Sequence, residues 1–412
     1  MAVLLAGGGA YALASINWCR VPTPEAAKII STVSAEGPLS AGAAQVVLQP
    51  DFPVTVAGYG PFRPTASRAE ISLQARALVV QAGKARVGWV TLDTLLVTDE
   101  MTRAIRDDAK LDGVWVSATH THSSMGGYDP RPMAQLAGTG VYRHRDRDAW
   151  VTASVQALRL AAKSLRPATV SSGQASLEGH VAARSGDHVD TSFRVTRFQD
   201  DNGPIAQLVA LSAHPTLVPR DHGLLNPDYP GLFATAQASS AGITLVLQSA
   251  GGNAKVVGGS TTPQAFADVL NGLMKAITFS APVSNVSLKA STVSFVLPRP
   301  DATRLVGAFF RMPAENFMCL SSSFQGEVQA LRLGELMWWS APFELSAASA
   351  QTLGASAPSA AGISLTNGYF GYLEPEAAVS AKSGESNRQY FAPSLSVTVT
   401  EAVSTALRAV QP

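Results

Sequence analysis

A chain of 412 residues, 46% hydrophobic and 15% charged, is long enough to bury a large core in one sizeable domain or two smaller ones. The 31 basic residues nearly balance the 30 acidic ones and form no prominent block, which argues against nucleic acid as a partner. The composition therefore predicts a globular protein whose ligand is neutral or lipid-like.

Residues 1–18 form an apolar N-terminal segment that is shorter than the roughly 20 apolar residues needed to span a bilayer. It is typical of a signal remnant or an anchor, and a buried helix is the alternative. Residues 19–38 are polar and contain proline, which indicates a tether before a single domain over residues 39–412. We do not expect Cys19 and Cys319 to form a disulfide, because Cys19 lies at the edge of the apolar segment. An exported or membrane-anchored, extracytoplasmic protein is expected.

Strand-like and helix-like runs alternate along the rest of the chain. A helix over residues 151–165 is predicted from its apolar face, with Asp148 as its N-cap. We expect strands over 71–83, 85–98, 113–119, 242–248 and 326–344, a hairpin over 192–215, and helices over 99–111, 264–277 and 394–410. The pattern predicts an α/β fold of mixed α+β type, with a β-sheet core flanked by helices.

Two histidines one residue apart, His120 and His122, end the run "VWVSATHTH" just before a glycine pair. On a strand, residues two apart face the same side about 7 Å apart, so both imidazoles could address one metal ion. Alone, such a pair is also typical of polar residues that face solvent at a strand end. The metallo-β-lactamase-like extension His-x-His-x-Asp-His is absent, because Ser124 and Met125 occupy its last two positions.

Three more polar side chains follow predicted strands, namely His214, Glu344 and Tyr372. Ligand sites in open α/β sheets lie outside the carboxyl ends of strands, so these side chains could converge with His120 on one rim. Each has a simpler interpretation as well. His214 could cap a turn, and Tyr372 could be a core residue. Glu344 could lie at a helix N-terminus, where the helix dipole stabilises its carboxylate.

These motifs together resemble the neutral/alkaline non-lysosomal ceramidase family over residues 39–391. The similarity runs from "LSAGAAQVVLQPDFPVTVAGYG" through "SATHTHS", "GGY", "ALSAHPT" and "NPDYPG" to "APFEL" and "TNGYFGY". The resemblance implies a zinc-dependent amidase that hydrolyses the N-acyl bond of ceramide, or of a related N-acyl lipid, to a sphingoid base and a fatty acid. It also implies a metal site at the carboxyl ends of strands.

The resemblance assigns the site residues one by one. Its zinc ligands correspond to His120, His214, Glu344 and Tyr372. His122 corresponds to a histidine beside the metal that contacts substrate or the developing oxyanion, and Tyr372 could alternate between ligand and donor. Arg184 corresponds to an arginine of the substrate pocket. Asp228 could orient a ligand by hydrogen bonding, although a carboxylate in a turn is the commoner interpretation. Imidazoles and a carboxylate suit Zn²⁺, which in catalytic sites keeps one position for water.

The chain departs from the family in the loop after "GITLVLQ". Family members carry there a serine that is usually designated the nucleophile, whereas this loop reads "SAGGNAKV". Gly252 stands at the family's aspartate and Ala254 at its serine. The family's "SGPGG" is altered to "SSMGG", and we expect a catalytic domain without the C-terminal immunoglobulin-like domain of the long forms.

Two functions follow from this combination of features. The first is an active zinc amidase in which water, rather than a serine, attacks the amide of an N-acyl lipid. This enzyme would contact the membrane through its N-terminal segment. The second is a catalytically impaired ceramidase-like protein that binds metal and lipid. Retention of all four ligand positions predicts zinc in either case.

Overall fold

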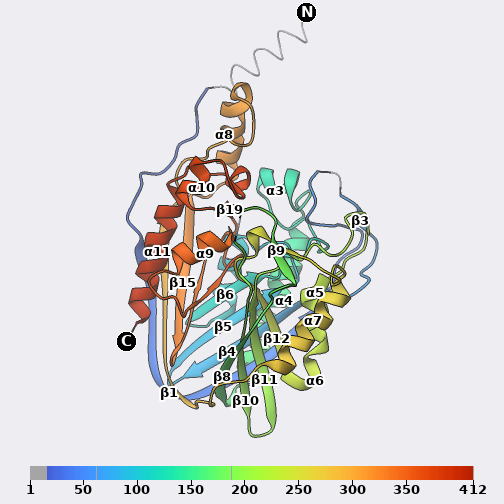
Figure 1. Ribbon diagram of the computed structural model, residues 1–412, viewed down its shortest axis with the longest axis vertical. Coiled ribbons are helices and arrows are strands. Elements are labelled where there is room, and N and C mark those ends of the chain that lie inside the picture. Colours follow the sequence, from blue (N-terminus) through green and yellow to red (C-terminus); the bar gives the residue numbers. More distant parts are fainter. Residues whose placement is uncertain (1–15, 62, 187, 412) are drawn as a thin grey trace, which may run out of the picture.

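The computed structural model describes residues 16–61, 63–186 and 188–411, and builds them from two stacked β-sheets between helical layers (Figure 1). Residues 1–15 of the apolar segment lie outside the described ranges. The larger sheet has the order β18-β16-β15-β14-β1-β4-β5-β6, and β7 pairs with β1. Its strands are β1 (Lys28–Val47), β4 (Gln74–Ala82), β5 (Ala85–Leu92), β6 (Gly113–Ala118), β7 (Arg166–Pro167), β14 (Asn285–Val296), β15 (Gln325–Leu333), β16 (Leu336–Ser340) and β18 (Ala361–Ile363).

The smaller sheet has the order β12-β11-β10-β8. Its strands are β8 (Thr169–Ser176), β10 (Ser192–Asp200), β11 (Gly203–Leu211) and β12 (Ile243–Gln248). The antiparallel pairing of β10 with β11 confirms the predicted hairpin. Three short pairs complete the β-structure: β2 (Val54–Thr55) with β3 (Thr65–Ala66), β9 (Val181–Ala183) with β13 (Ala254–Val256), and β17 (Glu344–Leu345) with β19 (Tyr372–Leu373).

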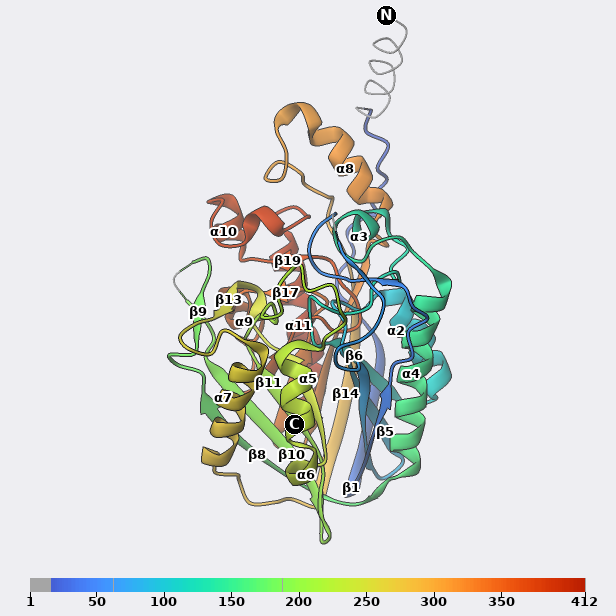
Figure 2. The ribbon, with the colours of Figure 1, turned by 90° about the vertical axis from the view of Figure 1, so that its right-hand side faces the viewer.

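Alternating side chains give each sheet two apolar faces. Leu78 and Trp89 point from the larger sheet into a core shared with Leu208 of the smaller sheet. Val79 faces the opposite way, into a second core beneath α4. Figure 2 shows the resulting layers from one side: α4, the larger sheet, the smaller sheet, then α5 and α7. This arrangement confirms the predicted mixed α/β fold with a β-sheet core flanked by helices.

The helices cover the outer faces of both sheets and the end that carries the site. They are α2 (Asp99–Ala109), α3 (Pro132–Ala137), α4 (His144–Lys163), α5 (Asp228–Ala236), α6 (Ala238–Ala241), α7 (Pro263–Ala276), α8 (Arg311–Leu320), α9 (Ala347–Leu353), α10 (Glu376–Ser380) and α11 (Leu395–Val410), with 3-10 turns η1 (Gly251–Asn253), η2 (Ala308–Phe310) and η3 (Ser386–Arg388). The predicted N-cap at Asp148 is wrong, because α4 begins at His144. Asp146 lies in its first turn, where the helix dipole favours a carboxylate, and pairs with Arg143 at 2.6 Å.

Two features of the N-terminal region differ from expectation. β1 begins at Lys28, so residues 28–38 of the expected tether pair with β14, while the rest of the strand pairs with β4. Cys19 and Cys319 form a disulfide, which corrects the sequence prediction. Only the fold brings these residues together, since 300 positions separate them. Within the described ranges, no helix combines the length and apolar character needed to cross a bilayer.

Candidate metal centre and active site

The predicted ligand side chains meet where strands end. His120 follows β6, and His214 follows β11. Glu344 and Tyr372 begin β17 and β19, and they are direct partners in that parallel pair. The two histidines thus lie at the carboxyl ends of strands as predicted, whereas Glu344 and Tyr372 lie at the starts of their strands.

Backbone carbonyls orient two of the imidazoles. His120 Nδ1 lies 2.6 Å from the carbonyl oxygen of Leu95, and His214 Nδ1 lies 3.3 Å from that of Gly251. These contacts turn the Nε2 atoms toward Glu344, whose Oε2 lies 3.2 Å from His120 Nε2 and 3.9 Å from His214 Nε2. Metal-binding histidines are usually oriented in this way, through the ring nitrogen that does not bind the ion.

His122 completes a cluster of three imidazoles. Its ring centroid lies 5.0 Å from that of His120 and 5.2 Å from that of His214. Candidate ligand atoms of the three histidines lie within 4.8 Å of one another. Gly58, at φ +125°, permits this approach, because a Cβ atom there would lie 2.7 Å from His122 Cα.

The electrostatic environment keeps two of these imidazoles neutral. Burial, together with the neighbouring imidazoles, lowers the pKa of His122 well below its usual value and that of His214 to about 3. Burial would raise the pKa of the Glu344 carboxyl, but its contacts with His120 and His214 outweigh burial and hold it below the ordinary range. Neutral imidazoles beside an ionised carboxylate are in the protonation states that bind a metal.

Unpaired polar atoms at the centre of the cluster support a metal there. His120 Nε2, both ring nitrogens of His122 and Glu344 Oε2 are buried and have no hydrogen-bond partner among the described residues. Burying such atoms without partners is costly, and one cation shared between them would remove that cost. Imidazole and carboxylate groups are also the donor types of catalytic zinc, so the residues present fit a zinc ion.

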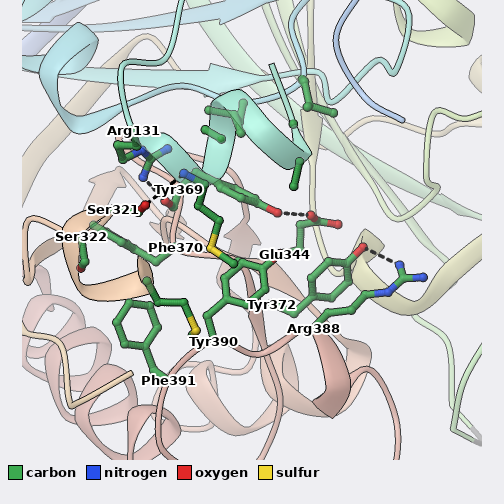
Figure 3. Close-up of a pocket in the computed structure, with 18 of the residues that line it drawn as sticks. Arg131, Ser321, Ser322, Glu344, Tyr369, Phe370, Tyr372, Arg388, Tyr390 and Phe391 are labelled. Atoms are coloured by element: carbon green, nitrogen blue, oxygen red, sulfur yellow. Dashed lines mark hydrogen bonds between the residues drawn. The ribbon is translucent and has the colours of Figure 1, made fainter. Parts of the chain in front are cut away.

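Tyr369 and Tyr372 lie beside the Glu344 carboxylate, and Arg388 reaches the Tyr372 hydroxyl (Figure 3). The Tyr369 hydroxyl donates to Glu344 Oε1 at 2.7 Å. The Tyr372 hydroxyl accepts from Arg184 at 2.6 Å and from Arg388 at 3.3 Å. Burial and the charge of Glu344 raise the pKa of Tyr372 well above its usual value, so this hydroxyl keeps its proton. The structure thus places Arg184 in the site, in contact with Tyr372.

Asp228 supports the site without lying in it. Its Oδ2 accepts from the backbone N–H of Leu217 at 2.9 Å and of Val218 at 3.0 Å, in the loop that follows His214. Burial raises its pKa to about 6, against the effect of these backbone hydrogen bonds. Among the described residues, the Asp228 side chain makes no hydrogen bond to a histidine ring, and these two bonds join it to the loop backbone instead.

The position of the family serine does not face the cluster. Ala254 is fully buried in β13, opposite Ala183 of β9, and lines neither cavity beside the histidines. The loop contributes backbone atoms instead: the carbonyl of Gly251 contacts His214, and that of Gly252 accepts from Arg184 at 2.6 Å. A Cβ atom at Gly252 would lie 2.8 Å from the carbonyl oxygen of Leu345, so this segment packs directly on β17.

Two cavities open on the cluster from different sides. The first, of about 310 Å³, is mainly apolar and lies between α3, α8 and the segment of Tyr390 and Phe391 (Figure 3). The second, of about 570 Å³, includes Arg184, Arg220 and Arg388 in its wall, and we call it the polar chamber after these charged side chains. Four residues line both cavities: Gly58, His122, Tyr372 and Arg388. The metal centre therefore lies where an apolar pocket meets a polar chamber.

Sequence reasoning missed several contributors to this geometry. Tyr369 was visible only as the first tyrosine of the Tyr-x-x-Tyr motif, and its bond to Glu344 follows from the fold. Glu385 binds Arg184 at 3.0 Å and Arg388 at 3.3 Å, yet "GESNRQY" carries no recognisable signal. The carbonyl of Leu95 could not be identified at all, because any residue type supplies one.

Comparison with known proteins shows a match to one family model and a fold shared with solved structures. Residues 47–240 match the family model for the N-terminal part of neutral/alkaline non-lysosomal ceramidase. The crystal structure of neutral ceramidase from Pseudomonas aeruginosa matches with a TM-score of 0.74 and 17% identity, over 91% of this chain and 75% of that one. A ceramidase complexed with C2 matches with a TM-score of 0.76 and 15% identity, over 90% and 76%.

The fold is thus that of the neutral ceramidases, with a buried histidine cluster at the strand ends. The match of residues 47–240 to the family model, together with this shared fold, confirms the resemblance recognised in the sequence.

Proposed function

We propose that this protein is a zinc-dependent amidase that hydrolyses the N-acyl bond of ceramide or of a related N-acyl lipid. The observation that carries the proposal is the convergence of unpaired imidazole and carboxylate atoms where the apolar pocket meets the polar chamber. In the reaction the C–N bond breaks, and water supplies a hydroxyl group to the acyl carbon and a proton to the nitrogen.

His120, His214, Glu344 and Tyr372 would hold the ion. Bound there, zinc would polarise the amide carbonyl and activate water for attack. The protein prepares the site by fixing two imidazoles through the carbonyls of Leu95 and Gly251, and Glu344 through Tyr369. Because these groups are already oriented, little reorganisation opposes the reaction.

His122 and Tyr372 supply the protons. His122 is neutral and has both ring nitrogens unpaired, so one N–H can donate to the developing oxyanion while the other nitrogen accepts a proton. Tyr372 would alternate between two roles: when it does not bind the ion, its protonated hydroxyl, held by Arg184 and Arg388, can donate to a substrate oxygen or nitrogen. Arg184 therefore acts on the reaction through Tyr372.

The apolar pocket suits an acyl chain. Its wall includes Leu96, Met133, Met318, Phe370 and Phe391, which offer aliphatic, thioether and aromatic surface next to His122. A hydrocarbon chain in this pocket would be removed from water, at roughly 0.8 kcal/mol per buried methylene. The carbonyl at the end of such a chain would then lie at the histidine cluster.

Binding without turnover is the alternative, and Ala254 at the family's serine position favours it. Hydrolysis of a fluorescent short-chain ceramide by purified protein of known metal content separates the two. The proposal expects fatty-acid release by protein that contains zinc. Zinc-loaded protein that binds the ceramide without releasing fatty acid would establish the alternative.

We also propose that the protein is exported and meets its substrate at a lipid surface. The disulfide between Cys19 and Cys319 supports export, because such bonds persist in oxidising compartments. The disulfide also joins the N-terminal arm to α8, and Met318 of α8 lines the apolar pocket.

Exposed aromatic side chains gather on this same tip of the molecule. Trp18, Phe309 and Phe310 are the exposed Trp and Phe residues among those described, at 46%, 63% and 58% exposure. Aromatic residues favour membrane interfaces. In Figure 1, α8 projects from the body beside the N-terminal arm.

Vesicle co-sedimentation of the Phe309→Ser/Phe310→Ser variant tests the lipid contact. We expect roughly tenfold weaker binding than in the wild type, from the loss of apolar burial. The control is Val397→Ser, which removes an exposed apolar side chain on α11. Equal binding by all three proteins would refute a lipid-binding tip.

A further inference from the structure

The polar chamber has positively charged side chains in its wall, for which a neutral ceramide offers no counter-charge. Among the described residues, its wall contains three arginines, Arg184, Arg220 and Arg388, and no aspartate or glutamate. Glu385 lies behind the wall and pairs with Arg184 at 3.0 Å and with Arg388 at 3.3 Å. Two of the three guanidinium groups therefore share one carboxylate, and Arg220 does not pair with it.

Arg220 has the least compensated charge of the three. Among the described residues, no carboxylate oxygen lies within 4.0 Å of its nitrogens. Its contacts are the carbonyl oxygen of Tyr59 at 3.4 Å and the face of the Tyr59 ring, with 5.9 Å between the guanidinium carbon and the centroid. The side chain is exposed at the chamber, so an arriving anion can reach it.

The position of the chamber decides which part of a substrate it receives. It meets the apolar pocket at His122 and Tyr372. An amide held at the histidines with its acyl chain in the pocket directs its amine portion into the chamber. A sphingoid base would bring there a second long chain and, after cleavage, a cationic amine, and arginines repel that charge. A carboxylate on the amine portion would instead accept charge-assisted hydrogen bonds.

The geometry points to a substrate with one acyl chain and an anionic group on the amine side of the amide, as in an N-acyl amino acid. This inference rests on the proposed function for the bond that is cleaved. The anion lies between Arg220 and Arg388, the acyl chain lies in the apolar pocket, and hydrolysis releases a fatty acid and an amino acid.

Binding tests the inference independently of turnover. N-lauroylglycine and N-lauroylethanolamine share an acyl chain and differ in a carboxylate against a hydroxyl, and N-lauroyltaurine replaces the carboxylate by a sulfonate. Calorimetry on the zinc-loaded protein should show both anions bound about tenfold more tightly than the ethanolamide, as charge-assisted bonds imply. A preference for only one anion would identify the headgroup chemistry. Equal binding of all three, or tighter binding of the ethanolamide, would overturn the inference.

Arginine variants locate the preference. Arg220→Gln should reduce the anion-to-ethanolamide ratio by about fivefold, and Arg220→Lys should keep part of it, since a charge contact without the planar fork is weaker. Arg408→Gln on the exposed side of α11 is the matched control and should keep the wild-type ratio. An unchanged ratio in Arg220→Gln would overturn the assignment to this chamber.

Hydrolysis of the same amides and of a short-chain ceramide separates this inference from the proposed function. A higher kcat/KM for ceramide than for N-lauroylglycine would overturn the inference and leave the amidase intact. Anion-selective binding without hydrolysis of any amide would refute the amidase while leaving the anion site in place.

Discussion

The histidine cluster and the loop of residues 249–256 are neighbours, but they contribute to the site in different ways. The cluster supplies buried imidazole and carboxylate side chains with unpaired atoms. The loop supplies two backbone carbonyls, from Gly251 and Gly252, and its glycines pack against His214 and β17. Ala254, at the position of the family serine, faces neither cavity.

This difference locates the chemistry. Nucleophilic catalysis by serine needs a hydroxyl within hydrogen-bond reach of a base, and residue 254 provides none. The cluster, in contrast, has the donor atoms, protonation states and supporting contacts of a metal centre. In the proposed reaction, the metal centre is therefore the place of hydrolysis and the loop is a scaffold.

Replacing a metal ligand should cause the largest loss of zinc and of activity. His120→Ala and Glu344→Gln should each lose most of the zinc and lower kcat/KM by at least about 10³, because the ion contributes several kcal/mol to the transition state. Elemental analysis and amide hydrolysis measure the two effects. His144→Ala, which removes a histidine at the start of α4, should change neither. Full zinc content in both ligand variants would contradict the assignment.

His122 should separate catalysis from metal binding. His122→Ala should keep the zinc and lower kcat by about 10² to 10³, the usual cost of losing an oxyanion donor or a proton carrier. Zinc content and steady-state kinetics decide the matter. If the variant loses zinc as completely as His120→Ala, then His122 is a ligand, as its place in the cluster of three histidines would allow.

The loop's role as a scaffold can be tested at Gly252. A methyl group there would lie 2.8 Å from the carbonyl oxygen of Leu345 and 3.1 Å from the carbonyl carbon of Glu344, so β17 must shift. We expect Gly252→Ala to weaken zinc affinity by about 10- to 100-fold, as disturbed supporting contacts do. Gly259→Ala is the control, since a Cβ atom there meets nothing within 4 Å. Equal zinc affinity in the two variants would show that the loop does not position Glu344.

A serine placed in the loop should have the smallest effect. Ala254→Ser adds a hydroxyl in a fully buried position that lines neither cavity. We therefore expect kcat to change by less than about threefold, whereas gaining a catalytic nucleophile would raise kcat by orders of magnitude. The measurement is hydrolysis of a fluorescent short-chain ceramide. A large gain of activity in this variant would mean that the loop reaches the substrate.

Much of this architecture could be predicted from short stretches of the sequence. The strands that end at His120 and His214, the hairpin of β10 with β11 and the final helix each follow from patterns within a short stretch. The start of β1 was missed because residues 28–38 are polar, and only pairing with β14 makes them a strand.

The unpredicted parts of the site depend on contacts between distant segments. The disulfide of Cys19 with Cys319 and the pairing of Glu385 with Arg184 join residues that no sequence pattern connects. Leu95 orients His120 through its backbone carbonyl, and because every residue type has such a carbonyl, the sequence cannot indicate this contact. Ala254 shows that a motif can also mislead. Alignment to the family's loop predicted a position in the site, but Ala254 is buried in β13.

The most direct test of the account is the activity of the wild-type protein as a function of zinc occupancy. Zinc is removed with a chelator and restored in steps, while hydrolysis of a short-chain ceramide and of N-lauroylglycine is followed. The account predicts that activity disappears with the metal and returns in proportion to occupancy, reaching its maximum at about one ion per chain. Full activity in zinc-free protein, or turnover that appears only in Ala254→Ser, would contradict it.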